Sequence, residues 1–138
     1  MNSGILIKFI SKIAKIERLI LPKRCVSIKI MDENVPYIDK IIPIIVSLAS
    51  PDQIILFGSY ARGDNTEKSH IDLLIFKKGL KGGSDIIGSI YMAFYENKIN
   101  IPVDLLAIDY NRYIELNNEI GYVYKTIKEQ GKIIYGTL

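Results

Sequence analysis

Apolar residues follow two periods along this chain, and the change of period separates predicted helices from predicted strands. Short continuous apolar runs predict buried strands over residues 53–57, 71–76, 101–108 and 132–135. Helical spacing predicts helices over residues 37–49, 85–98 and 109–130. Since helices and strands alternate, the sequence predicts an α/β (α+β) fold in which a small mixed β-sheet is flanked by helices.

Single residues within these runs predict where elements bend, begin or break. Pro43 is expected to kink the first of these helices or to restart it after Ile42, because proline cannot donate an intrahelical hydrogen bond. Ser84 is expected to cap the helix that follows it. A break at Gly121 would divide the last helical run into two parts.

The positive charge of the chain is concentrated at its start. Seven bases stand against one acid in residues 1–30, namely Lys8, Lys12, Lys15, Arg18, Lys23, Arg24 and Lys29 against Glu17. Residues 31–138 are mildly acidic, although the chain as a whole has a formal net charge of +3. The sequence therefore predicts a basic extension over residues 1–30 and one domain over residues 31–138.

Residues 5–21 of this extension have the pattern of a basic amphipathic helix, with an uncharged run too short to span a bilayer. It could attach to a membrane surface, or pack on its own domain or a partner, and the second interpretation is favoured. A third is that Met31 is the true start of the protein. Charge alone is weak support for nucleic-acid binding, because basic runs are usually solvated helix faces.

The composition indicates one globular domain in a reducing compartment. The chain has 138 residues, of which 49% are hydrophobic and 24% charged, as in folded proteins. Cys25 is its lone cysteine and cannot form an internal disulfide, so we expect a cytoplasmic protein. A catalytic role for Cys25 is not favoured, because the single histidine, His70, has a stronger assignment.

Two adjacent runs carry most of the candidate chemistry. Gly58-Ser59 ends a predicted strand and opens a polar loop, where backbone N–H groups and a hydroxyl could approach an anion. By itself this pair favours a plain strand-to-helix turn, because the motif is short and common. His70 and Asp72 share one side of the next strand, since side chains alternate along a strand. Asp104 lies in a third apolar run and is expected to be a buried carboxylate that needs a cation.

The alternative for Asp104 is an ion pair with an arginine such as Arg62. Two carboxylates beside a phosphate site favour Mg²⁺, which takes oxygen ligands and shares them with substrate phosphates.

The runs 57–63, 70–73 and 103–105 together resemble the polymerase-β-type nucleotidyltransferase superfamily. Within it they are most similar to minimal nucleotidyltransferases (MNT proteins), which are encoded beside HEPN-domain partners. The resemblance covers about residues 35–136 and rests on three separate parts of the sequence. It implies that ATP is the substrate and that AMP is transferred to a tyrosine of a HEPN toxin, so that the chain acts as an antitoxin.

The resemblance also implies a role for each matching residue. Gly58 and Ser59 would bind the triphosphate, with Arg62 as a looser candidate for phosphate or partner contact. Asp72 would bind Mg²⁺ (or Mn²⁺), and Asp104 would bind metal and help to deprotonate the attacking hydroxyl. His70 stands where the family has its first metal-binding aspartate.

Histidine at this position weakens the expected metal site, because an imidazole offers one lone pair and no negative charge. It leaves three interpretations of His70: a slow or Mn²⁺-preferring enzyme, a pseudoenzyme that still binds nucleotide, or a substitution introduced to inactivate the protein. At the level of function, the rival to the enzyme is a binding module that neutralises its partner by masking it.

Overall fold

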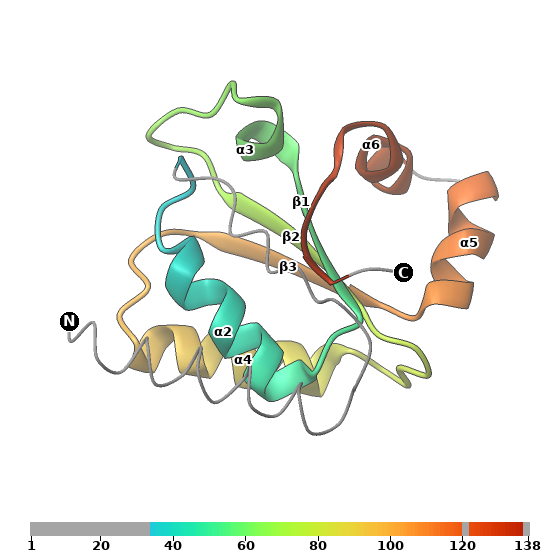
Figure 1. Ribbon diagram of the computed structural model, residues 1–138, viewed down its shortest axis with the longest axis horizontal. Coiled ribbons are helices and arrows are strands. Elements are labelled where there is room, and N and C mark those ends of the chain that lie inside the picture. The colour runs from blue at the N-terminus through green and yellow to red at the C-terminus, as the bar shows by residue number, and fades with distance from the viewer. Residues whose placement is uncertain (1–33, 120–121, 137–138) are drawn as a thin grey trace.

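The computed structural model describes residues 34–119 and 122–136 (Figure 1). Four strands form one sheet in the order β3-β2-β1-β4, and they are β1 (Gln53–Phe57), β2 (Ile71–Phe76), β3 (Val103–Ile108) and β4 (Lys132–Gly136). The helices are α2 (Ile38–Ala49), α3 (Gly58–Arg62), α4 (Ser84–Glu96), α5 (Tyr110–Glu119) and α6 (Tyr122–Gln130). The expected α/β (α+β) fold is confirmed.

The sheet is mixed, as the sequence predicted. Strand β1 is antiparallel to both β2 and β4, whereas β2 and β3 run parallel. A parallel pair needs a crossover connection, which α4 provides between β2 and β3. Among the described strands β3 pairs with β2 alone, so it is one edge of this four-stranded sheet (Figure 1).

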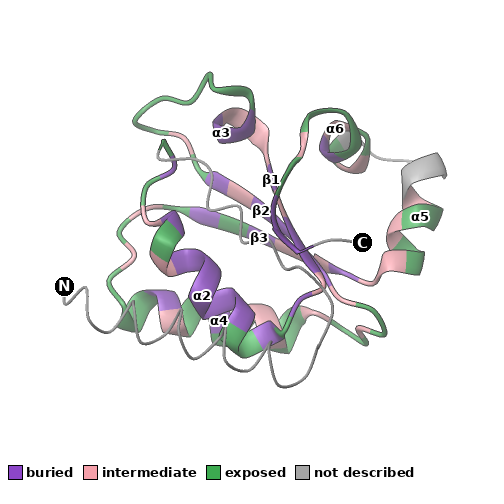
Figure 2. Ribbon diagram, viewed as in Figure 1, coloured by how far each residue is buried: buried purple, intermediate pink, exposed green. Residues whose placement is uncertain are grey.

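Helices cover both faces of the sheet, and this explains why the strands are apolar runs with no regular polar alternation. Leu73 and Ile75 belong to the larger core, which includes residues of α2 and α4. Leu74 and Phe76 belong to a smaller core with Ile127 of α6 and residues of α5. Figure 2 shows this burial through α2 and the sheet, with exposed residues concentrated in the loop that follows α3.

Two predicted helix boundaries differ from the structure. Helix α2 is continuous through the buried Pro43, so the predicted restart after Ile42 is wrong. Ser84 is the first residue of α4, and its predicted capping role is also wrong, because Gly83 is the N-cap. A Cβ on Gly83 would lie 3.0 Å from the Cβ of Ala107 in β3, so glycine allows the helix to begin against the strand.

The predicted helix over residues 109–130 is two helices, since α5 ends at Glu119 and α6 begins at Tyr122. Gly121 itself lies outside the described residues, as do the predicted helix over residues 5–21, Cys25 and Met31. Within the ranges 34–119 and 122–136, each helix is too short or too polar to cross a bilayer.

Candidate active site

Gly58 lies where β1 ends and α3 begins, in contact distance of the Asp72 carboxylate. Its φ of 72° is in the left-handed region, which strongly favours glycine. A Cβ built on Gly58 would overlap the Asp72 carboxylate, since its distance to Asp72 Cγ is only 3.0 Å. The neighbouring Phe57 is the register partner of Asp72 across the antiparallel pair. Glycine at this position is therefore what allows the Gly-Ser turn and the candidate carboxylate to approach each other.

Asp72 and Asp104 are neighbours on adjacent strands. They are register partners in the parallel pair of β2 and β3, so their side chains leave the sheet on the same face. Asp72 is half-buried. Burial first, and then the charge of Asp104, raise the pKa of the Asp72 carboxyl, although the nearby His70 and Arg62 act in the opposite direction. The two carboxylates therefore repel each other in the absence of a cation.

His70 precedes β2 and reaches across to β3. Its Nδ1 lies 3.0 Å from Oδ2 of Asp104. An ionised carboxylate only accepts hydrogen bonds, so Nδ1 is the donor and Nε2 carries the free lone pair of the neutral ring. Both side chains are more than half exposed, at 51% for His70 and 61% for Asp104. The three residues that the sequence singled out, His70, Asp72 and Asp104, are therefore brought together at one end of β2 and β3.

The predicted burial of Asp104 was wrong, and the alternative of an ion pair with Arg62 is not formed. Asp104 is exposed, because it is the second residue of β3, the edge strand of the described sheet. Its side-chain partner is His70, and Arg62 has other partners. What would favour a cation beside Asp104 is therefore the neighbouring charge of Asp72, and not burial of Asp104 itself.

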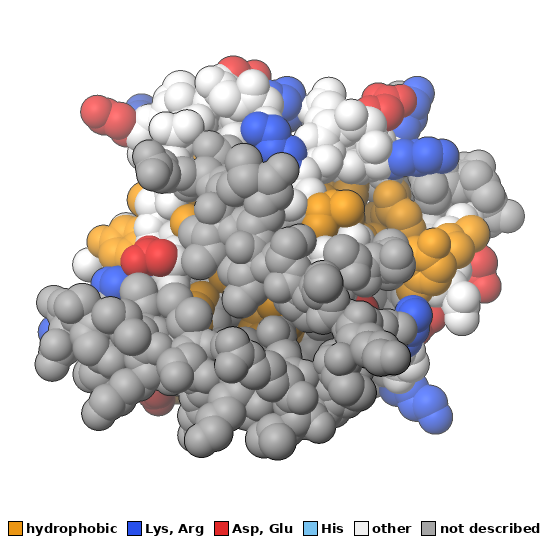
Figure 3. Space-filling view, viewed as in Figure 1, with side chains coloured by type: hydrophobic (Ala, Val, Ile, Leu, Met, Phe, Trp, Pro, Cys, Tyr) orange, Lys and Arg blue, Asp and Glu red, His pale blue; other side chains and the backbone are white. Residues whose placement is uncertain are grey.

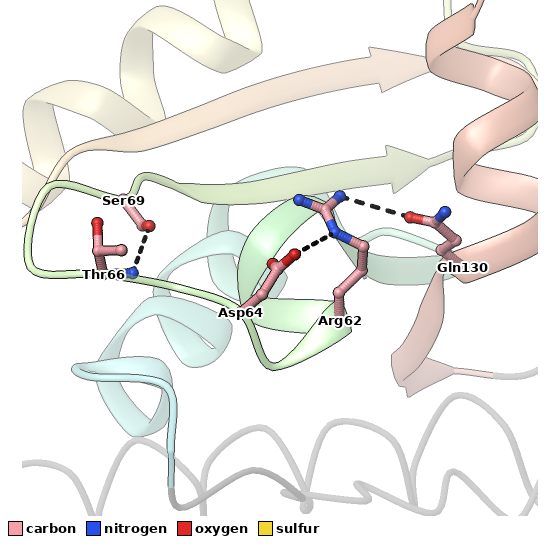
Figure 4. Close-up of polar contacts among 5 residues, drawn as sticks. All are labelled: Arg62, Asp64, Thr66, Ser69 and Gln130. Carbon is pink, nitrogen blue, oxygen red and sulfur yellow. Dashed lines mark hydrogen bonds and ion pairs between the residues drawn. The ribbon is translucent and has the colours of Figure 1, made fainter.

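Arg62, at the end of α3, is held by groups from two parts of the chain (Figure 4). Its Nε donates to Oδ2 of Asp64 at 3.1 Å, and one terminal nitrogen donates to Oε1 of Gln130 at 3.4 Å. The guanidinium remains 41% exposed, and its charge lowers the pKa of Asp72. Arg62 thus lies near the carboxylate pair on a side where an incoming anion could replace Asp64.

The loop between α3 and β2 is held by its own hydroxyl groups (Figure 4). The backbone N–H of Thr66 donates to Oγ of Ser69 at 2.8 Å, and the N–H of Lys68 donates to Oγ1 of Thr66 at 3.3 Å. This turn ends one residue before His70. It leads the chain back across the Gly58-Ser59 turn, where Ser59 is the half-buried second residue of α3.

The donor set fits one divalent cation that is shared with a substrate. Within the part of the chain that the structure describes, no three His, Cys, Asp or Glu side chains are grouped to hold a metal ion by themselves. Two adjacent carboxylates are nevertheless the usual protein contribution to a Mg²⁺ site that is completed by water and phosphate oxygens. Their mutual repulsion would be relieved by such an ion.

Two residues near the site were not identified from the sequence. Gln130 bonds to Arg62 from a helix 68 residues later. Tyr91 of α4 bonds to the backbone of β3 on both sides of Asp104. No local pattern marks either residue, because each contact depends on how distant elements pack.

Basic side chains form no continuous patch on the face drawn in Figure 3, where Lys and Arg are scattered among other residues. Hydrophobic side chains are visible on the same face near α5 and α6 (Figure 3). Ile114 of α5 and Val123 of α6 are among the exposed large hydrophobic residues, at 43% and 47%. Among the described residues, this face therefore has an exposed hydrophobic surface near α5 and α6.

Comparison with known proteins agrees with this fold. A solved structure described as a toxin-antitoxin with AMP-PNP has a similar fold, with a TM-score of 0.53 and 22% sequence identity over 72% of this chain and 73% of that one. No curated protein matches the chain. The model of the family described as "Polymerase beta, Nucleotidyltransferase" matches residues 39–137, a range that contains every candidate site residue. The chain therefore belongs to the polymerase beta nucleotidyltransferase family.

Proposed function

We propose that this protein is a minimal nucleotidyltransferase that transfers AMP from ATP to a tyrosine hydroxyl of a HEPN toxin, and that it acts as an antitoxin in the cytoplasm. One observation carries the proposal: Asp72 and Asp104 are paired in register on parallel strands, directly beside Gly58. Such a pair can hold a divalent cation next to a turn that can receive phosphate.

Each site residue has a distinct role in the proposed complex. The backbone at Gly58 and the hydroxyl of Ser59 contact the triphosphate, while Arg62 leaves Asp64 to meet it. Asp72 and Asp104 would hold Mg²⁺ or Mn²⁺ together with phosphate oxygens. His70 would add a nitrogen ligand, which suits Mn²⁺ better than Mg²⁺, once its hydrogen bond to Asp104 is broken. The bound ion would neutralise charge on the phosphates as the transfer proceeds.

The transfer is a displacement at the α-phosphorus. The tyrosine oxygen forms the new P–O bond, and the bond between the α-phosphorus and the oxygen that bridges to the β-phosphorus breaks. Pyrophosphate leaves with that electron pair. The hydroxyl proton is lost to Asp104, which is exposed and can therefore be reached by a side chain from another protein.

A toxin partner is supported by fold likeness. The solved structure of similar fold is a toxin-antitoxin with AMP-PNP. The open position of His70 and Asp104 also fits a protein acceptor, which must approach from outside.

Labelled ATP tests the proposal directly. The protein is incubated with ATP labelled on the α-phosphate, with Mg²⁺ or Mn²⁺, and with the HEPN protein encoded beside it. We expect label on the toxin, and loss of that label when the acceptor tyrosine is replaced by phenylalanine. If no label is transferred even after His70→Asp restores a carboxylate, the proposed activity is wrong.

The second candidate is a binding module that neutralises the toxin by masking it. The hydrogen bond between His70 and Asp104 favours it, because that bond occupies one of the two carboxylates. Masking predicts that Asp72→Ala and Asp104→Ala leave both the complex and the neutralisation unchanged. Transfer predicts an intact complex with an active toxin, so a toxin assay beside a binding assay separates the two.

A further inference from the structure

Strand β3 carries Asp104 and lies at the edge of the sheet formed by residues 53–136, where β2 is its one neighbour among the described strands. In a parallel pair, alternate residues direct their backbone groups toward the neighbouring strand, and the residues between them direct theirs outward. The N–H of Ile71 donates to the carbonyl of Pro102, so the even-numbered residues of this segment point inward. Val103 and Leu105, which flank Asp104, therefore present backbone groups to the outside.

A single hydroxyl bonds to two of these outward groups. The hydroxyl of Tyr91 donates to the carbonyl of Val103 at 2.9 Å and accepts the N–H of Leu105 at 3.2 Å. Beside Asp104, the hydroxyl takes the place that the backbone of a further strand would have in a wider sheet. The ring of Tyr91 packs edge-to-face against Phe94, with 6.2 Å between centroids, and Phe94 is buried in the core. The hydroxyl is therefore anchored to the core through its own helix.

We infer that Tyr91 is a positioning residue for Asp104, and this inference rests on the proposed function. The two hydrogen bonds fix the backbone on both sides of Asp104, and hence the direction in which its carboxylate leaves the sheet. Without them, the backbone of β3 at this end would be hydrogen-bonded to β2 alone among the described strands. Small displacements of a reacting group are costly, because about 1 Å can reduce a rate on the order of a hundredfold.

The test is Tyr91→Phe, which removes the hydroxyl and keeps the ring. The matched control is Tyr95→Phe on the same helix, whose side chain is 82% exposed. Label transfer is measured in the wild-type and His70→Asp backgrounds. We expect Tyr91→Phe to lower kcat about tenfold and to leave the KM for ATP unchanged, while the control changes neither.

A double substitution shows whether the effect passes through Asp104. Adding Tyr91→Phe to Asp104→Ala should lower the residual rate no further, because the carboxylate to be positioned is absent. Full additivity would mean that Tyr91 acts on the whole fold, and would overturn the inference. The inference would also be overturned if Tyr91→Phe left kcat unchanged in the wild-type and His70→Asp backgrounds.

Amide hydrogen exchange separates failure of the inference from failure of the proposed function. We expect the Leu105 amide to exchange about tenfold faster in Tyr91→Phe, because it loses its acceptor. If neither background transfers label, the proposed function fails, and the exchange rate alone decides whether Tyr91 holds this strand. An unchanged rate at Leu105 would overturn that role.

Discussion

The imidazole of His70 is hydrogen-bonded to the carboxylate of Asp104, with 3.0 Å between Nδ1 and Oδ2. The family resemblance implies a carboxylate at position 70, and two carboxylates in this place would repel each other unless a cation lay between them. With histidine the pair attracts in the absence of a metal. With histidine at position 70, Asp104 is therefore hydrogen-bonded to a side chain, whereas the resemblance implies two carboxylates that both bind metal.

Restoring a carboxylate with His70→Asp should increase both metal binding and transfer. The added negative charge lies next to the ion, and a charge pair of this kind is worth a few kcal/mol at an effective dielectric near 20. We expect Mg²⁺-dependent transfer to rise on the order of a hundredfold, measured as single-turnover label transfer. The control is His70→Ala, which removes the imidazole and adds no charge. An equal increase in label transfer by His70→Ala would contradict this, because it would show that the increase comes from releasing Asp104 from its hydrogen bond and not from the added carboxylate.

Gly58→Ala should be more damaging than Gly63→Ala. Both glycines have positive φ, 72° and 80°, so each substitution carries about 1 kcal/mol of backbone strain. A Cβ at Gly63 meets no atom within 4 Å, whereas at Gly58 it overlaps the Asp72 carboxylate. We expect Gly58→Ala to lose roughly 1–3 kcal/mol more in free energy of unfolding, as measured by urea denaturation. Equal losses in the two variants would mean that Asp72 moves aside freely.

Asp72→Asn should make the protein slightly more stable at neutral pH while abolishing transfer. Burial and Asp104 raise the pKa of Asp72 in the folded state, so the ionised carboxylate is a cost to folding. This destabilisation is absent at pH values below 3.8, the ordinary pKa of the carboxyl group, and reaches its full size above the raised pKa of the folded state. We expect a gain on the order of 0.5 kcal/mol at pH 7, because the group is partly exposed and screened by solvent.

Thermal unfolding of wild type and Asp72→Asn across pH 3 to 8 measures this difference. The two curves should converge at the acidic end and separate as pH rises. If the difference in unfolding temperature instead grew as pH fell, the prediction would be wrong.

Asp109 should stabilise the fold through hydrogen bonds from two segments. Its carboxylate accepts the N–H of Gly79 at 2.6 Å and the N–H of Asn111 at 3.0 Å, and so links the turn after β2 to the start of α5. These backbone hydrogen bonds, that of Gly79 first, lower the pKa of the carboxyl. Asp109→Ala should reduce the unfolding temperature by several degrees at pH 7, as loss of a helix-cap acceptor does.

The pH dependence follows from the direction of that pKa change. The stabilisation by Asp109 is complete above its ordinary pKa of 3.8 and is lost as pH falls through the lower value of the folded state. The difference in unfolding temperature between wild type and Asp109→Ala should therefore narrow at strongly acidic pH. Asp109→Asn keeps an acceptor oxygen without charge, and we expect it to fall between the two at pH 7.

The sequence by itself determined the elements and the chemistry of the site. Strands β1 and β2 begin and end where the continuous apolar runs do, because their residues are buried whichever strand they pair with. Alternation along a strand placed His70 and Asp72 on one face, and the resemblance to a known family singled out Gly58 and Asp104 beside them.

Only the tertiary structure decided how these residues meet. The parallel register that pairs Asp72 with Asp104, the hydrogen bond from His70 and the two bonds of Tyr91 join segments well separated along the chain. Asp104 was expected to be buried and proved exposed, because burial depends on which strand lies at the edge. Local patterns record whether a residue suits a strand or a helix, but pairing order is set by the packing of distant segments, for which the sequence gives no short-range signal.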